Sequence, residues 1–336
     1  MSPHRPLQGS TEDRLIARYF GPLAMHPGAL GLSDDAAMIT PPPGCDLILK
    51  TDGVISGVHF FPDDPADLVA KKALRMNLSD LAAKGAKPLG FLLAIALPKD
   101  LAEVWLAGFA RGLGEDAEYY DCPLLGGDTD RTPGPTAVSI AAFGTVPQGT
   151  MVRRSGAKAG DRVIVTGTIG DAALGLRLRQ DPAAANNWDL GERLRDDLLD
   201  RYLLPQPRNE IAEILRSYAS AAMDVSDGLV GDLSKLCHAS NVSADIESQR
   251  VPLSEAARKV LTSDPDLMET VLTGGDDYEI VATVTPAKLR PLTAAAQAVG
   301  ITVTEIGEVA AGDGDARFVG AQGNPLAFAR PSFSHF

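Results

Sequence analysis

The sequence is short of cysteine and of long apolar runs, and both shortages exclude whole classes of protein. Its three cysteines, Cys45, Cys122 and Cys237, are odd in number and too far apart for a Cys-x-x-Cys metal site, so we expect no disulfide framework. Residues 91–97 form the most apolar segment, far below the roughly 20 residues that cross a bilayer. Residues 1–11 contain no apolar stretch typical of a signal peptide. We therefore expect a protein of the reducing cytoplasm that does not bind membranes.

Basic residues are also scarce. The chain has 31 Lys and Arg against 44 Asp and Glu, which leaves a net charge of -13. Such a chain repels phosphate backbones, so we expect no direct binding of nucleic acid. With 45% hydrophobic and 22% charged residues over 336 positions, the composition is typical of a globular protein of about two domains.

Segments typical of strands and of helices alternate along the chain, which predicts a two-domain α/β (α+β) fold. We expect strands at residues 47–51, 91–97, 136–146, 162–167, 278–284 and 301–309, with 91–97 buried. We expect helices at residues 64–85, 100–120, 171–179, 190–204, 208–219 and 228–239, one after Pro286, and a polar stretch at 180–189. Residues 147–160 are rich in Gly, Pro and basic side chains, so we place a boundary near residue 150, between domains 1–150 and 151–336.

Aspartates beside glycine or hydroxyl residues recur along the chain. The six clusters are Ser33-Asp34-Asp35, Thr51-Asp52-Gly53, Asn77-Leu78-Ser79-Asp80, Gly126-Gly127-Asp128-Thr129, Asp224-Val225-Ser226-Asp227-Gly228 and Gly274-Gly275-Asp276-Asp277. A single cluster is ordinary turn or helix-cap chemistry. If the fold brings several together, their carboxylates repel one another unless divalent cations lie among them. Oxygen ligands without sulfur or imidazole favour Mg²⁺, which in turn suits phosphate substrates.

Two further features fit phosphate chemistry. Arg153-Arg154-Ser155-Gly156 is a basic loop in an acidic chain, and it could hold a phosphate or simply be an exposed linker. Asn77 and Asp80, three residues apart on the expected helix, could coordinate an ion or lie at a partly exposed helix position. P-loop, zincin, EF-hand and nucleophile-elbow motifs are absent from the sequence.

These motifs, in this order, resemble the thiamine-monophosphate kinase family of the superfamily that includes aminoimidazole ribonucleotide synthetase (PurM-like proteins). The resemblance covers residues 10–336 and includes Gly57-Val58-His59-Phe60, Gly167-Thr168-Ile169-Gly170-Asp171 and Gly274-Gly275-Asp276-Asp277-Tyr278-Glu279 besides the aspartate clusters. It implies a two-domain PurM-like fold whose N-terminal sheet forms a homodimer. It also implies transfer of the γ-phosphate of ATP to thiamine monophosphate with several Mg²⁺ ions, the last step in making thiamine diphosphate.

The resemblance further implies roles for individual residues. The metal set is Asp35, Thr51, Asp52, Asp80, Asp128, Asp224 and Asp227, and the ATP contacts are Tyr120, Gly127, Asp128, Arg154 and Ser226. The substrate contacts are His59, Asp276 and Phe333, and Asp128, Arg154 and Asp224 are the expected catalytic residues.

Three positions depart from the family pattern. Lys50 precedes Thr51-Asp52 where a hydroxyl residue is usual, Ser33 replaces a glycine, and Asp276 stands where glutamate is common. The Asp276 side chain is thus one methylene shorter than the usual glutamate. Two alternatives stay open: another ATP-using PurM-like enzyme, although the hydrogenase-maturation and selenophosphate enzymes use a terminal cysteine that this chain lacks, or a non-catalytic metal- or nucleotide-binding relative.

Overall fold

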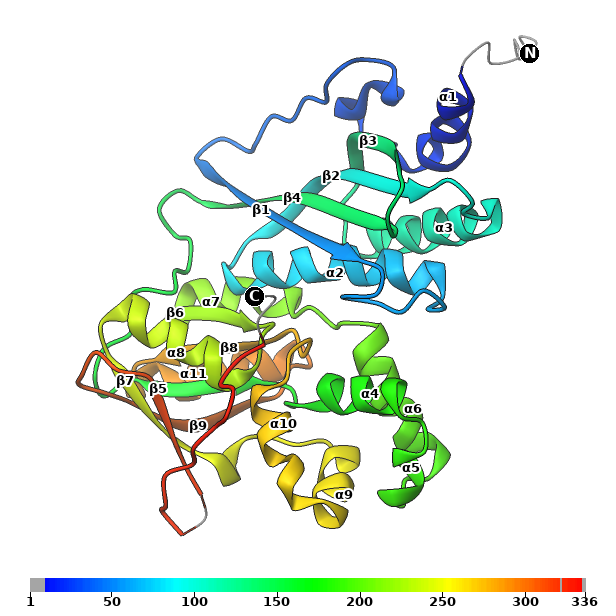
Figure 1. Cartoon of the computed structure of the whole chain (residues 1–336). Helices are drawn as coiled ribbons and strands as arrows, with labels where there is room; N and C mark the ends of the chain where they lie inside the picture. The colour runs from blue at the N-terminus through cyan, green and yellow to red at the C-terminus, as the bar shows by residue number, and fades with distance from the viewer. Residues whose placement is uncertain (1–9, 321, 334–336) are drawn as a thin grey trace. The chain divides into compact units, whose positions relative to one another are not determined.

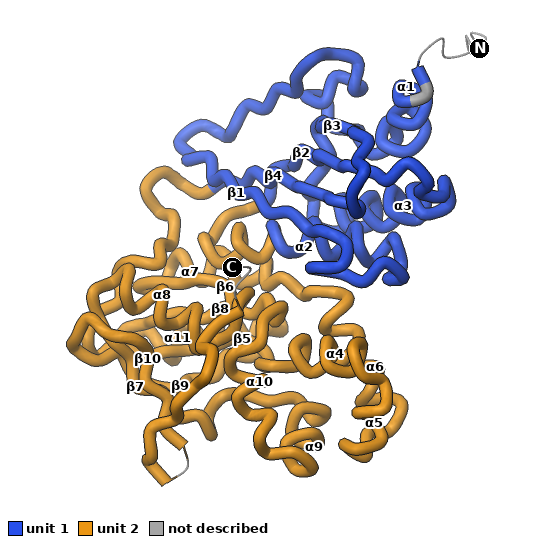
Figure 2. Tube along the Cα trace, viewed as in Figure 1, with its two compact units in different colours: residues 1–77, 88–145 blue, residues 78–87, 146–336 orange. Residues whose placement is uncertain are grey.

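The computed structural model describes residues 10–320 and 322–333, which form two compact units (Figures 1 and 2). Unit 1 comprises residues 1–77 and 88–145, and unit 2 comprises residues 78–87 and 146–336. Residues 1–9, part of the segment without a signal-peptide pattern, lie outside the described residues, as do residues 321 and 334–336. Among the described helices, none combines the length and apolarity needed to span a bilayer. The boundary near residue 150 stays a prediction.

Unit 1 is built on a four-stranded sheet. Its elements are α1 (Thr11–Leu15), β1 (Cys45–Ile55), α2 (Ala66–Ala83), β2 (Lys87–Pro98), α3 (Glu103–Tyr119), β3 (Leu124–Thr132) and β4 (Ala137–Pro147). The strand order is β1-β4-β2-β3, with β2 and β3 parallel. Strands β1 and β3 are therefore the two edges of the sheet.

One face of this sheet packs against helices, and the other is open along β1. The apolar faces of α2 and α3 are buried, with Leu74 and Phe109 both at 0% exposure, and both helices lie on the same side of the sheet (Figure 1). Along β1 every second side chain is exposed, including Leu47 and Leu49. Because successive side chains of a strand point to opposite faces, this alternation marks an uncovered apolar surface.

Unit 2 is built on a six-stranded sheet of order β10-β7-β9-β5-β8-β6. Its strands are β5 (Arg162–Thr166), β6 (Ala219–Val225), β7 (Ser243–Glu247), β8 (Glu279–Val284), β9 (Val303–Ala310) and β10 (Ala316–Val319). Its helices are α4 (Asp171–Gln180), α5 (Ala184–Asn187), α6 (Glu192–Leu203), α7 (Ala212–Tyr218), α8 (Leu229–Ser240), α9 (Glu255–Ser263), α10 (Met268–Thr273) and α11 (Pro286–Ala298).

Both faces of the second sheet carry helices. Val163 and Val165 of β5 pack in one apolar cluster with α8, whereas Ile164 between them packs in another with α7 and α11. A third cluster joins α4, α5, α6, α9 and α10. Because β8 is an interior strand with helices over both faces, all six of its positions are buried, and four of them are apolar.

The structure corrects several sequence-based expectations. Residues 91–97 are not uniformly buried, because Ala94 is exposed and exposure alternates along β2. The helix expected to reach residue 219 ends at Tyr218, and Ala219 begins β6. The polar stretch 180–189 contains the short helix α5, anchored by buried Trp188. Strands β3, β6, β7 and β10 and helices α9 and α10 were not expected.

Candidate active site

Two expected metal ligands and one expected nucleotide contact lie where β6 ends and α8 begins. Asp224 is in β6, and Ser226 and Asp227 form the turn that follows. Oδ2 of buried Asp232, in the first turn of α8, accepts the backbone N–H of Ser226 at 2.9 Å and of Asp227 at 2.8 Å. Lys235 Nζ donates to the carboxylates of Asp227 at 2.6 Å and Asp232 at 2.9 Å. Burial raises the pKa of Asp232, and Lys235 opposes that rise.

Two segments distant in sequence attach to this turn through main-chain hydrogen bonds. The N–H of Asp276 donates to the carbonyl oxygen of Ser226 at 2.9 Å, and the N–H of Phe333 donates to that of Asp227 at 3.0 Å. A Cβ on Gly275 would lie 2.5 Å from the Ser226 carbonyl oxygen, so only glycine allows this close approach. The Phe333 side chain is 52% exposed. Expected metal, nucleotide and substrate residues of unit 2 therefore meet at one turn.

The end of helix α2 also contacts this region, because residues 78–87 belong to unit 2. Ser79 Oγ donates to Asp224 Oδ2 at 3.0 Å, and both residues are buried. Lys84 Nζ donates to the carbonyl oxygen of Ala222 at 2.7 Å. Asp80, next to Ser79, is half-buried. The structure thus places the expected ligands Asp80 and Asp224 on elements that touch.

The basic loop is fixed along its backbone and free at its side chains. The Arg153 carbonyl accepts the N–H of Ala222 at 3.0 Å, and Ser240 Oγ donates to the Arg154 carbonyl at 3.0 Å. Gly156 has φ of +137°, and a Cβ there would lie 2.4 Å from the Ser220 carbonyl oxygen. Both arginine side chains are exposed, and neither has an ion-pair partner within the described chain. A fixed backbone with available guanidinium groups suits anion binding better than a loose linker does.

A buried charge cluster lies directly after the loop of Asp276. Glu279, at 0% exposure, accepts Arg201 Nη2 at 2.9 Å and Arg208 Nε at 2.7 Å, and Thr166 Oγ1 donates to it at 2.7 Å. Its neighbour Asp277 accepts the N–H of Gly170 at 2.9 Å. Burial raises the pKa of Asp277 well above its usual range, because the ionised carboxylate loses its hydration there.

In unit 1, strand β1 carries the expected residues Thr51 and Asp52, and His59 follows it. Strand alternation places the Asp52 side chain on the face opposite Thr51, whose side chain is exposed with Leu49. Lys50 Nζ lies 3.1 Å from Asp52 Oδ2, so the departure from the family pattern supplies an ion pair to this carboxylate. His59 Nδ1 accepts the N–H of Ile55 at 3.0 Å. The neutral imidazole therefore carries its proton on Nε2, where it can donate to a ligand.

Strand β3 carries Gly127 and Asp128 at the other edge of the sheet. A Cβ on Gly127 would lie 1.8 Å from the Leu93 carbonyl oxygen, so packing alone requires glycine there. The exposed Asp128 accepts the N–H of Thr129 at 2.9 Å. Since β4 and β2 separate β1 from β3, the strands that carry Asp52 and Asp128 are three strand spacings apart, about 14 Å.

Tyr120 and Asp35 complete the expected set in unit 1. Tyr120 follows α3 and lies beneath Arg75, whose guanidinium carbon is 5.5 Å from the ring centre. Arg75 is held by a bidentate pair with Asp116 at 2.5 and 2.9 Å. Asp35 is exposed and follows the helical turn Pro27–Leu32, which contacts β3.

The expected ligands fit a hard cation by their chemistry, since all are carboxylates except the Thr51 hydroxyl. In addition, the buried Oδ1 of Asn77 has no hydrogen-bond partner among the described residues. No group of three or more His, Cys, Asp or Glu side chains in residues 10–320 and 322–333 is arranged to hold a metal ion. Thiol ligands are disfavoured, because burial raises the pKa of Cys122 to about 12 and of Cys237 to about 11.

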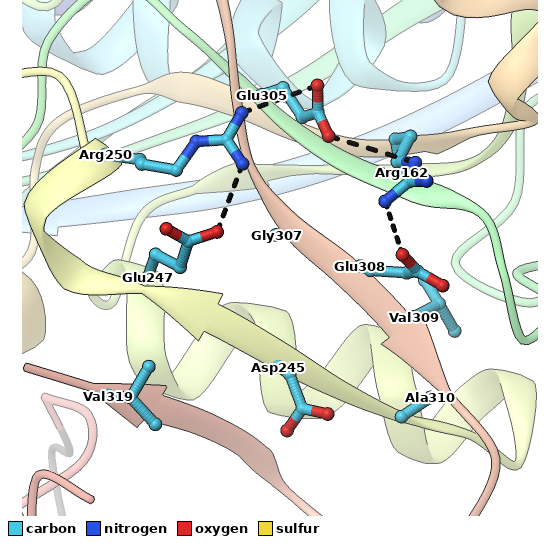
Figure 3. A pocket seen from close by; sticks show the side chains of 10 residues that line it. All are labelled: Arg162, Asp245, Glu247, Arg250, Glu305, Gly307, Glu308, Val309, Ala310 and Val319. Carbon is cyan, nitrogen blue, oxygen red and sulfur yellow. Dashed lines mark hydrogen bonds and ion pairs between the residues drawn. The ribbon is translucent and has the colours of Figure 1, made fainter. Parts of the chain in front are cut away.

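A separate cavity of about 310 Å³ lies over β5, β7 and β9 and contains none of the expected site residues (Figure 3). Its two arginines are both paired. Arg250 lies 3.2 Å from Glu247 and 3.4 Å from Glu305, and Arg162 pairs with Glu305 and Glu308. Four carboxylates line the cavity against these two arginines, and one of the four, Asp245, pairs with Arg317, so the lining is acidic overall.

Sequence reasoning missed Asp232, Lys235, Arg201 and Arg208. Asp232 had a readable signal, since an acidic residue in the first turn of a helix often caps the preceding N–H groups. The arginines had none, because Arg201 and Arg208 lie more than 70 residues from Glu279, and only the fold brings them together.

Known proteins match this chain over most of its length. The family model described as AIR synthase related protein, N-terminal domain, matches residues 33–146, and that of the C-terminal domain matches residues 158–320. A thiamine-monophosphate kinase of Caulobacter vibrioides is 44% identical over 310 residues, covering 90% of this chain and 85% of the relative.

Two solved structures are similar as well. The crystal structure of thiamine-monophosphate kinase from Stenotrophomonas maltophilia K279a is 37% identical with a TM-score of 0.80, covering 95% of this chain and 98% of that one. A structure described as AaThiL complexed with AMPPCP and TMP is 28% identical with a TM-score of 0.77, covering 100% and 99%.

Proposed function

Since this chain belongs to the AIR synthase related proteins and, among them, to the thiamine-monophosphate kinases, we propose that it transfers the γ-phosphate of ATP to thiamine monophosphate. The products are thiamine diphosphate and ADP. The observation that carries this assignment is the full-length match to a relative whose structure holds AMPPCP, an ATP analogue, together with TMP. The resemblance expected from the motifs is thereby confirmed, as is the PurM-like two-domain fold. The cysteine usage predicts that the reaction takes place in the cytoplasm.

The chemistry explains why the chain needs no nucleophile motif. The acceptor is itself a phosphate, whose oxygen is already ionised at neutral pH, so no general base has to activate it. What the reaction requires is relief of the repulsion between two polyanions and an in-line arrangement of the reacting atoms. Mg²⁺ bound by acidic side chains would neutralise the phosphates and align them.

We assign ligands for Mg²⁺ to both units. In unit 1 they are Asp35, Thr51, Asp52 and Asp128, and in unit 2 they are Asp80, Asp224 and Asp227. Oxygen donors without sulfur or imidazole support this choice of ion. The Ser79 hydrogen bond orients Asp224, and the Lys235 ion pair orients Asp227. Because successive side chains of β1 point to opposite faces of the sheet, Thr51 would reach an ion on the Asp52 side only through its backbone.

The other expected residues bind the two substrates. Arg154 extends from a fixed backbone and would donate to the transferring phosphate, while Ser226, Tyr120 and Gly127 contact the nucleotide. His59 would donate from Nε2 to thiamine monophosphate, Asp276 would meet its positive charge, and the half-exposed Phe333 would stack on its ring.

A homodimer would bring the acidic Mg²⁺ ligands of unit 1 together. Asp52 and Asp128 lie on opposite edges of one sheet, with β4 and β2 between them, so one chain cannot bring them to a common ion. A second copy that places its β3 edge beside β1 would set Asp52 next to Asp128 of the partner subunit. Two-fold symmetry would form this pairing twice, so the two sheets would close on each other and cover the exposed apolar side chains of β1, including Leu47 and Leu49.

The activity is tested by incubating purified protein with ATP, Mg²⁺ and thiamine monophosphate and separating the products by chromatography. We expect equal amounts of thiamine diphosphate and ADP, and loss of both products with excess chelator. ADP release that does not depend on thiamine monophosphate, with no thiamine diphosphate, would refute the assignment and indicate another acceptor.

A further inference from the structure

The loop that carries Asp276 has an uncommon backbone conformation. Asp276 and Tyr278 both have positive φ, +70° and +51°, a region that is costly for residues with large side chains. Hydrogen bonds hold the loop in this shape, because the N–H of Asp276 donates to Ser226 and that of Tyr278 donates to the carbonyl oxygen of Val225 at 2.8 Å. Backbone strain of this kind clusters at functional sites.

This conformation brings two side chains of the loop into contact. The hydroxyl of Tyr278 donates to Oδ1 of Asp276 at 3.2 Å. Tyr278 is 3% exposed, so packing fixes its ring and the direction of its hydroxyl, whereas Asp276 is only half-buried. A hydrogen bond from a fixed donor limits the rotation of the carboxylate that receives it.

The residues directly before and after Tyr278 are held as well. Arg201 Nη2 donates to the Asp277 carbonyl oxygen at 3.2 Å and also to the Glu279 carboxylate. A Cβ on Gly167 would lie 2.1 Å from a Glu279 carboxylate oxygen, so the opposing strand end also approaches closely. Tyr278 therefore lies between two residues that Arg201 holds, through the main chain of Asp277 and the side chain of Glu279.

We propose that Tyr278 is a positioning residue, which aims the Asp276 carboxylate at the cationic thiazolium ring of thiamine monophosphate. The proposal rests on the proposed function, in which Asp276 contacts the substrate. Its physical basis is the short side chain of Asp276, which has one torsion fewer than glutamate and cannot adjust its reach. Because the Asp276 side chain cannot adjust its reach, the position of its carboxylate depends more strongly on the hydrogen bond from Tyr278.

The test compares Tyr278→Phe with the wild-type enzyme. We expect KM for thiamine monophosphate to rise about tenfold, the lower end of the range for loss of one hydrogen bond to a charged group, with kcat and KM for ATP within about twofold. The matched control is Tyr218→Phe, because the Tyr218 hydroxyl makes no hydrogen bond within the described part of the chain. The control should leave all three constants unchanged.

A double-mutant cycle separates positioning from a structural role. In an Asp276→Ala background, Tyr278→Phe should no longer affect KM for thiamine monophosphate, because the carboxylate it directs is gone. An effect of equal size in both backgrounds, no effect in either, or failure of Tyr278→Phe to fold would overturn the proposal. A wild-type enzyme that makes no thiamine diphosphate would instead refute the proposed function.

Discussion

The two units hold their acidic motifs in different ways. In unit 2, three sequence-distant segments are joined at the Ser226–Asp227 turn by main-chain hydrogen bonds, and buried Asp232 caps that turn. In unit 1, Asp52 and Asp128 lie on opposite edges of a sheet whose β1 face is open. The comparison teaches that the chain itself positions the C-terminal residues, whereas the N-terminal ones need a further component, which we propose is Mg²⁺ and a second subunit.

The largest effect is expected in unit 1, at Asp128. Asp128→Asn keeps the size of the side chain but removes the charge that would hold the cation, so turnover should fall about a thousandfold or more. Because Asp128 is exposed, the melting temperature should stay within a few degrees of wild type. Steady-state kinetics and circular dichroism melting measure the two quantities. Near-normal turnover would remove Asp128 from the metal set.

The next largest effect is expected in unit 2, whose own hydrogen bonds and ion pairs position its site residues. Glu279→Gln leaves Arg201 and Arg208 with an uncompensated buried charge, so the free energy of unfolding should fall by about 3–5 kcal/mol. Glu213→Gln is the matched control, since its side chain is 85% exposed. Urea unfolding of both variants measures the difference. Equal stability of the two variants would show that the cluster does not hold unit 2 together.

A smaller effect is expected at the substrate end of unit 2. Phe333→Ala should raise KM for thiamine monophosphate about tenfold, because loss of a stacked ring removes on the order of 1–1.5 kcal/mol. KM for ATP should change little. Initial-rate kinetics with each substrate varied in turn decide the point, and equal increases in both KM values would contradict the stacking role.

The smallest effect concerns pH. The raised pKa of Asp277 means that the folded state binds its proton more tightly than the unfolded state, so stability falls as pH rises from about 4, the unfolded pKa, through the folded value. Asp277→Asn should flatten this decline, since an amide oxygen can still accept the Gly170 N–H. Urea midpoints measured between pH 4 and 8 test this, and parallel curves for both proteins would refute it.

The sequence predicted the fold where periodicity was strong and failed where tertiary context decided. Helix α2 and strand β8 could be predicted, because their apolar residues follow the spacing typical of an amphipathic helix and of a buried strand. Strand β6 was missed because its alanines carry no strand signal, and β3 was missed because glycine and aspartate are rare in strands. The aspartate clusters identified the residues, but the opposite-edge placement of Asp52 and Asp128 depends on strand order, which no local pattern contains.

Mixing two inactive variants tests the central claim most directly. Asp52→Asn and Asp128→Asn subunits, unfolded together and refolded at equal amounts, would form heterodimers in which one site has both mutations and the other has none. If each site takes Asp52 from one subunit and Asp128 from the other, about a quarter of the wild-type activity should return, because half of the dimers are mixed and half of their sites are intact. Activity that remains at the level of the separate variants would contradict a shared site.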